Sequence, residues 1–147
     1  MQLPGNTLIT IRQIFKFYEH CLEGVRTKYQ LSSLEIKIIS FLYHNPGHDT
    51  VGEIAELRML SKGNVSTAAD SLIQKGLLVR QPDKRDRRWV HLLLRSSAAP
   101  IVEEIEAAGK VFCQQAFAGF TPEDWERYEQ LNSLLAQNIR NSLERGS

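Results

Sequence analysis

The sequence has few cysteines and no long apolar run. Cys21 and Cys113 are too few and too far apart for a disulfide framework or a zinc site built on cysteine pairs, so both are expected to be free thiols. No apolar stretch approaches the length that crosses a bilayer, and no charged and then apolar leader follows Met1. The sequence therefore predicts a cytoplasmic protein.

The motifs of common enzyme sites are also missing. There is no glycine-rich phosphate loop, no catalytic pair of carboxylates, and no Ser or Cys in a nucleophile turn. His44 and His48 flank a Pro-Gly turn, but no ligand spacing such as His-x-x-x-His supports a metal site with Cys21 or His20. We expect no enzyme activity, no cofactor and no bound metal. A cysteine hydrolase using Cys21 with His20 or His44 is the enzyme alternative.

The net charge of +1 hides an uneven distribution along the chain. Residues 61–91 carry seven basic and three acidic side chains, a net charge of +4. Residues 1–60 carry no net charge, and residues 92–147 carry a net charge of −3. One positive region on an otherwise neutral or acidic chain is typical of a nucleic-acid-binding surface.

Helical periodicity covers most of the chain. Apolar spacing predicts a first helix over residues 8–28. Ser32 with Glu35, and Thr50 with Glu53, have the capping-box spacing that starts a helix. The first of these helices should end at residues 45–47, and the second near residue 60. Ser61 is predicted to cap a further helix that ends at Gly76, so residues 50–76 form a helix-turn-helix.

A β-hairpin and two long helices are predicted after the helix-turn-helix. Residues 77–80 and 88–94 have strand composition and flank a charged turn. Ser96 or Ser97 is expected to cap a long helix that ends at Gly119. Residues 121–124 then start another helix with a threonine cap and a proline at its first position. The expected fold is mainly α with a small β-hairpin wing.

The helix that starts after Ser61 has a polar face suited to the major groove. Its exposed side carries small hydrogen-bonding groups near the amino end, namely Asn64, Ser66 and Thr67, with Ser71 one turn later. Lys62 and the amino end of the helix can contact phosphates. For this helix alone, a merely solvated face explains the pattern equally well.

The hairpin turn is more specific. Lys84, Arg85, Arg87 and Arg88 repel one another, so the fold gains little from this cluster unless an anion binds there. Asp83 and Asp86 are expected each to pair with a neighbouring arginine and orient it, and exposed pairs of this kind contribute about 0–1 kcal/mol. An arginine on a slender hairpin can enter the minor groove. The DNA-binding and wing-orienting predictions are therefore Lys62, Asn64, Ser66, Thr67, Ser71, Lys84, Arg85, Arg87 and Arg88, with Asp83 and Asp86.

These motifs resemble the MarR family of bacterial and archaeal winged helix-turn-helix regulators. Asp83, Arg85, Asp86 and Arg88 fit the Asp-x-Arg-Asp-x-Arg wing signature, and the similarity covers nearly the whole chain. It implies a homodimer that binds a pseudo-palindromic operator on double-stranded DNA and releases it when a small ligand or an oxidant acts. Thr67 and Ser71 depart from the pattern because relatives often have arginine there. More of the DNA affinity is therefore expected to come from the wing.

The helices at the two ends of the chain suggest how a dimer forms. Three long amphipathic helices cannot all bury their apolar faces on a small winged helix, and a twofold dimer would bury them. We therefore expect one MarR-like domain over residues 1–147. Residues 31–95 would be its DNA-binding part, and residues 1–30 and 96–147 its helical dimerisation part.

The remaining candidates favour structural roles. Cys21 lies on an apolar stripe and Cys113 beside Phe112, so packing is favoured for both over redox sensing. His91 is expected to be structural. The aromatic residues are expected to be core or dimer contacts rather than parts of a ligand pocket; they are Phe112, Trp125 and Tyr128. A winged-helix module that binds protein rather than DNA is the main alternative function.

Overall fold

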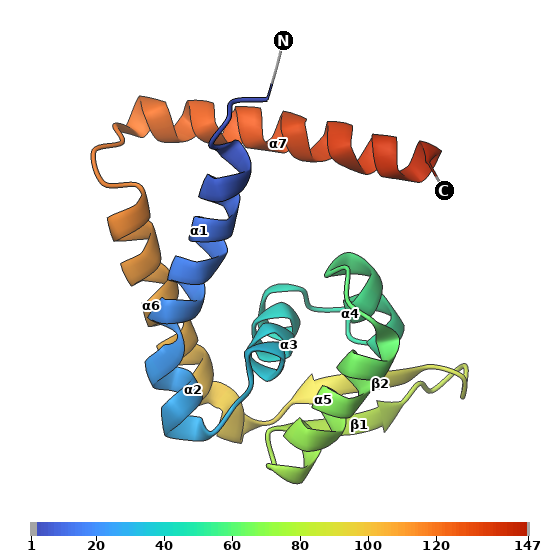
Figure 1. Cartoon of the computed structure of the whole chain (residues 1–147). Helices are drawn as coiled ribbons and strands as arrows, with labels where there is room; N and C mark the ends of the chain where they lie inside the picture. The colour runs from blue at the N-terminus through green and yellow to red at the C-terminus, as the bar shows by residue number, and fades with distance from the viewer. Residues whose placement is uncertain (1–2, 147) are drawn as a thin grey trace. The chain divides into compact units, whose positions relative to one another are not determined.

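The computed structural model describes residues 3–146 and is mainly helical, with one antiparallel hairpin (Figure 1). This confirms the predicted fold class. No helix in the described range is long and apolar enough to span a membrane. The elements in chain order are α1 Thr7–Cys21, α2 Glu23–Tyr29, α3 Ser33–His44, α4 Val51–Leu57, α5 Lys62–Gln74, β1 Leu78–Pro82, β2 Val90–Leu94, the 3₁₀ helix η1 Ser96–Ala98, α6 Ala99–Ala116 and α7 Pro122–Arg145.

The chain divides into two compact units, residues 1–112 and residues 113–147. The core of the first unit lies where α3, α4 and α5 meet the hairpin and the first turns of α6. Its most deeply buried side chains are aliphatic, and their burial is the main force that holds these elements together. They are Ile36, Ile38, Ile39, Ile54, Val65, Leu72, Leu78 and Leu92.

The amino end of α3 is fixed by a buried carboxylate. Ser32 and Glu35 form the predicted capping box, and the Glu35 carboxylate also accepts hydrogen bonds from Lys75 Nζ at 2.9 Å and Ser71 Oγ at 3.0 Å. Burial raises the pKa of Glu35, but hydrogen bonds from the Ser32 backbone, Lys75 and Ser71 outweigh it and hold the pKa below its ordinary value. Glu35 therefore joins the start of α3 to the end of α5.

The expected first helix over residues 8–28 is wrong in one respect, because it breaks at Leu22 into α1 and α2. Arg26 satisfies the freed end of α1, since its guanidinium donates to the Glu19 carbonyl at 2.9 Å and to the Glu19 carboxylate at 2.7 Å. The break buries both Leu22 and Val25 in the core. The periodicity persists across the break, so the sequence pattern gave no sign of it.

The helix-turn-helix has the predicted hydroxyl caps, but the capping box predicted at Thr50 is only half formed, because the Glu53 carboxylate accepts from the Thr50 hydroxyl rather than from its backbone N–H. The Thr50 hydroxyl accepts the Glu53 N–H, and the Ser61 hydroxyl accepts the Asn64 N–H. Gly76 ends α5 with φ +76°, a left-handed conformation that favours glycine. The Leu77 N–H then donates to the Leu72 carbonyl, as in a Schellman motif.

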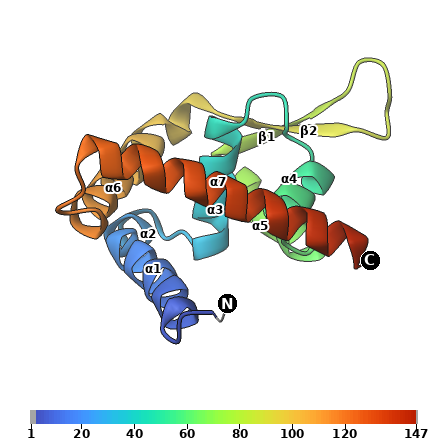
Figure 2. The same cartoon turned by 90° about the horizontal axis from the view of Figure 1, so that it is seen from above.

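The hairpin pairs β1 with β2 from Leu78 opposite Leu94 to Pro82 opposite Val90. Its inner end packs on the core through Leu78 and Leu92. The Leu92 N–H also donates to the Asp49 carbonyl at 2.8 Å, which fastens β2 to the segment before α4. The far end extends beyond the helices of the first unit in both views (Figures 1 and 2).

The start of α6 differs from the prediction. Neither Ser96 nor Ser97 supplies a side-chain cap to η1, the 3₁₀ turn that leads into α6. The Ser97 hydroxyl instead donates to the Gly76 carbonyl at 2.6 Å, so it ties this turn to the end of α5. Cys21 packs against the core as predicted, whereas Cys113 is exposed and the packing prediction for it is wrong.

The second unit contains the end of α6 and all of α7. Thr121 and Asp124 form a capping box at the predicted start of α7, with Pro122 in the first turn. The Phe117 ring stacks edge to face on Trp125, with ring centroids 4.6 Å apart, and also contacts Tyr128. In the first unit, Phe112 contacts Phe17 and Tyr18.

Replacing Lys75 with Ala should destabilise the first unit, because a buried carboxylate would lose its cationic partner. We expect a loss of about 1–3 kcal/mol in the free energy of unfolding at pH 7, measured with urea. The matched control is Arg80→Ala, which breaks the exposed Asp70–Arg80 ion pair and should cost less than about 1 kcal/mol. Equal losses in the two variants would contradict the role given to Glu35.

Candidate nucleic-acid interface

The exposed face of α5 carries the residues predicted to read DNA. Asn64 and Thr67 are exposed, and Ser66 is half-buried beside the fully buried Val65. The Ser61 cap leaves the amino end of α5 open to solvent, where free backbone N–H groups favour an anion. This surface therefore combines a phosphate-binding helix end with short hydrogen-bonding side chains.

Ser71 has a different environment from the other predicted contacts on α5. It is half-buried, and its hydroxyl donates to the Glu35 carboxylate in the core. The preceding residue, Asp70, is exposed and forms an ion pair with Arg80 of β1. This pair joins α5 to the hairpin and places an acidic group beside the exposed face.

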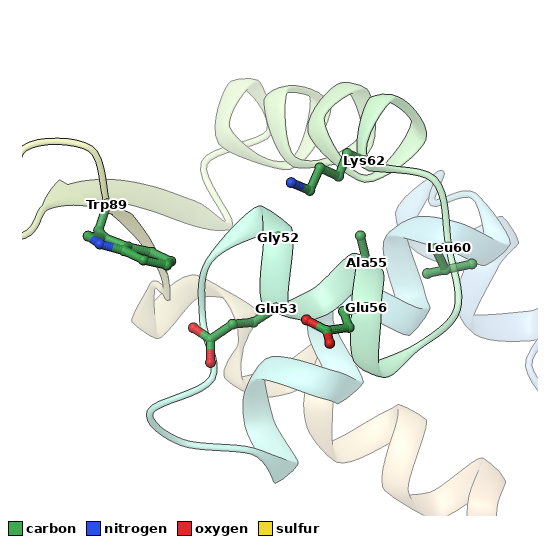
Figure 3. A pocket seen from close by; sticks show the side chains of 7 residues that line it. All are labelled: Gly52, Glu53, Ala55, Glu56, Leu60, Lys62 and Trp89. Atoms are coloured by element: carbon green, nitrogen blue, oxygen red, sulfur yellow. The ribbon is translucent and has the colours of Figure 1, made fainter. Parts of the chain in front are cut away.

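Lys62 points toward α4 (Figure 3). It lines a hollow of about 400 Å³ together with Glu53 and Glu56 of α4 and Trp89, the last residue of the turn before β2. Trp89 is 50% exposed. In this conformation the Lys62 ammonium group lies beside Gly52, so a phosphate contact would require the long side chain to swing outward.

The wing turn, residues 83–89, exposes its basic side chains. Lys84, Arg85 and Arg87 are all exposed, and the Arg88 side chain is 86% exposed. The Asp86 carboxylate accepts from the backbone N–H of Arg88 and binds the Arg88 guanidinium at 2.8 Å. The Arg88 side chain and backbone lower the pKa of Asp86. The predicted orienting pair is thus formed between Asp86 and Arg88.

Asp83 does not pair with an arginine, so that part of the wing prediction is wrong. One carboxylate oxygen accepts the backbone N–H groups of Arg85 and Asp86 at 3.0 and 2.9 Å, and the other contacts His91 Nε2 at 2.8 Å. The His91 hydrogen bond, followed by the two backbone donors, lowers the pKa of Asp83 to about 2. Asp83 therefore shapes the backbone of the turn and leaves Arg85 exposed.

His91 connects the wing to the helix-turn-helix. Its Nδ1 lies 2.5 Å from Asp49 Oδ1, while its Nε2 contacts Asp83. Hydrogen bonds to Asp83 and Asp49 raise the pKa of His91 to about 8. The structural role predicted for His91 is thereby confirmed. The sequence gave no sign that Asp49 takes part, because it lies 42 residues away in the chain.

Comparison with known proteins places this arrangement in a family. A model of the MarR family matches residues 29–88, which run from the end of α2 through the basic wing turn. Over this segment, the chain matches the MarR family of winged helix-turn-helix regulators. The resemblance drawn from the wing signature is confirmed.

Individual relatives extend the similarity beyond the matched segment. The Bacillus subtilis protein MdtR, described as an HTH-type transcriptional repressor, is 26% identical over 137 residues, which cover 92% of this chain and 87% of MdtR. A MarR protein from Peptoclostridium difficile shares the fold, with a TM-score of 0.84 at 18% identity over 99% of this chain and 95% of that chain. BpsR of Bordetella bronchiseptica, whose DNA binding is described as regulated by 6-hydroxynicotinic acid, superposes with a TM-score of 0.68 at 17% identity over 86% of this chain and 96% of BpsR.

Replacing Asp83 with Ala should loosen the wing turn without unfolding the protein. The amides of Arg85 and Asp86 would lose their acceptor, so their hydrogen exchange should accelerate about tenfold, as measured by NMR. Asp86→Ala is the matched control, because it removes the acceptor of the Arg88 amide and should leave the Arg85 amide unchanged. Unaltered exchange at Arg85 and Asp86 in Asp83→Ala would refute the role of this carboxylate.

Proposed function

We propose that this MarR-family regulator is a repressor that binds a pseudo-palindromic DNA operator as a homodimer. The observation that carries the proposal is the pairing of two surfaces within one unit: the exposed polar face of α5, and the wing turn with Lys84, Arg85, Arg87 and Arg88 exposed. A helix of this kind fits the major groove, and a basic hairpin beside it fits the adjacent minor groove. A cytoplasmic location is part of the proposal, since the chromosomal DNA of bacteria and archaea lies there.

Each side chain has a different part in the proposed complex. Asn64, Ser66 and Thr67 would contact base edges, while Lys62 and the amino end of α5 would contact phosphates. Ser71 would contribute less than predicted, because its hydroxyl already serves Glu35. The arginines of the wing turn would then provide most of the electrostatic attraction, and Asp83 and Asp86 would keep them in position.

The proposed dimer would bury the exposed apolar faces of the terminal helices. Leu8, Ile11 and Phe15 of α1 are 43–65% exposed. Along α7, a stripe of large apolar side chains is 37–60% exposed: Trp125, Tyr128, Leu131, Leu134, Leu135, Ile139 and Leu143. Contiguous exposed apolar surface of this kind marks a protein interface, and a twofold partner is the simplest occupant.

Release by a small ligand completes the proposal. A hollow of about 310 Å³ lies among α1, α3, Arg58 and Phe112, within the size range of small-molecule sites. Its lining is apolar at Ile14 and Phe15 and carries the cations Lys37 and Arg58. Glu19, an acid that also lines the hollow, is paired with Arg26. These features suit a small organic anion. Cys21 is half-buried in the core, which favours a ligand over an oxidant as the signal.

The wing arginines provide the sharpest test of DNA binding. The probe is a duplex recovered by selection from random DNA, for which we expect a twofold-symmetric site with half-sites about one helical turn apart. Arg85→Ala and Arg88→Ala should each weaken binding about tenfold, and each should reduce the salt dependence by about one phosphate contact. Arg140→Ala on α7, which removes the same charge from an exposed site outside the wing, is the control. Unchanged affinity in both wing variants, with fold and dimer intact, would favour a protein-interaction module.

The dimer has its own test on α7. Leu135→Glu places a charge on the apolar stripe and should shift the protein toward monomers in sedimentation experiments at micromolar concentration. Ser133→Glu is the matched control, because it adds the same charge to an exposed position on the opposite side of the helix. A protein that is monomeric before either substitution, or a dimer that Leu135→Glu leaves intact, would contradict the proposed interface.

A further inference from the structure

We propose that His91, in its doubly protonated form, is a positioning residue that locks the wing turn to the helix-turn-helix. Only the expected effect of this lock on DNA binding rests on the proposed function. The lock itself is a property of the free protein. It depends on the contacts of three side chains, Asp49, His91 and Asp83, which come from three separate segments of the chain.

The hydrogen-bonding capacity of imidazole requires the protonated form. Both ring nitrogens of His91 face carboxylate oxygens, at 2.5 Å for Asp49 and 2.8 Å for Asp83. A neutral imidazole has one N–H and can donate to one of these carboxylates, whereas an imidazolium donates to both. The arrangement also places two negative charges beside a ring that balances them only when it is charged. Below its pKa, His91 therefore bridges the two acids.

The bridge reaches the wing arginines through Asp83. One Asp83 oxygen binds His91, and the other holds the backbone N–H groups of Arg85 and Asp86. At the other end, the Asp49 carbonyl accepts the Leu92 N–H, which fixes β2 to the same segment before α4. A continuous set of hydrogen bonds thus runs from the start of the helix-turn-helix to the backbone that carries Arg85.

The surroundings of His91 fix the sign of the pH dependence. The charged side chains around it are Asp49 from the segment before α4 and Asp83, Lys84 and Arg85 from the wing turn. The two acids that touch the ring raise the pKa of His91 from 6.5 to about 8. The bridge is therefore complete below about pH 6.5 and is lost as the pH rises through about 8. Loss of the proton frees one carboxylate, so the side-chain bridge between Asp49 and Asp83 is broken, while the backbone bond from Leu92 to Asp49 remains.

The first experiment uses the full chain without DNA. NMR titration of the His91 ring should give a midpoint near 8, and the amides of Arg85 and Asp86 should shift with the same midpoint. Asp49→Asn should lower both midpoints together. His48→Gln is the matched control, because His48 pairs with Glu53 outside the wing and should leave both midpoints unchanged. Wing amides that do not follow the ionisation of His91 would overturn the proposal.

The second experiment measures affinity for the selected duplex at pH 6.5 and pH 9. At pH 9 about a tenth of His91 is still protonated. If the neutral form keeps the wing in its binding geometry about one tenth of the time, the apparent Kd rises about fivefold between these pH values. His91→Arg retains a charged group with several donors and should bind equally well at both, whereas His91→Gln should bind weakly at both. A flat profile for the unsubstituted protein, while Arg85→Ala still weakens binding, would overturn the lock. If Arg85→Ala also has no effect, the proposed function fails. The NMR titration without DNA then still shows whether His91 locks the wing turn.

Discussion

A two-stranded hairpin has too little buried surface to hold itself in place in water, and this constraint governs the wing. The inner ends of β1 and β2 are anchored in the core by Leu78 and Leu92. The outer end, where Trp89 and Val90 are exposed, depends on the hydrogen bonds that Asp83 accepts from the turn backbone and on its contact with His91. The position of the basic turn is therefore set by polar contacts, which respond to pH and salt more than apolar packing does.

The acidic residues near the wing order two of its arginines by pairing with them, and each pair neutralises one positive charge. Asp86 binds the Arg88 guanidinium, and Asp70 binds Arg80 on the adjacent strand. Arg85 keeps its charge free, because Asp83 contacts the backbone of the turn rather than a guanidinium. Within the wing, the backbone of Arg85 is held by Asp83 while its side chain is exposed, which suits insertion of the guanidinium into a groove of negative potential.

Local sequence signals predicted most of the fold, because caps and periodicity depend on residues close together in the chain. The Ser32 and Thr121 capping boxes, the Gly76 stop and the hairpin all lie where their motifs indicate. The break at Leu22 was missed, since apolar spacing continues across it and the compensating Arg26 contact comes from the next helix.

The predicted site was incomplete for a related reason. The wing signature identified the charged turn, but its anchor requires Asp49, which is brought to His91 only by the tertiary fold. Ser71 looked like a surface residue by helical spacing and is instead half-buried against Glu35 from a different helix. Contacts between segments distant in sequence have no periodic signal, and a single sequence contains no other record of them.

In the proposed complex, α5 and the wing turn contact adjacent grooves of the same DNA. Hydroxyl-radical footprinting of the selected duplex measures this arrangement, because the reagent reports sugar accessibility in the minor groove. We expect protection in the minor groove flanking each half-site, and loss of that protection in Arg85→Ala while contacts within the half-site persist. Flanking sugars that remain fully accessible in the complex with the unsubstituted protein would contradict it.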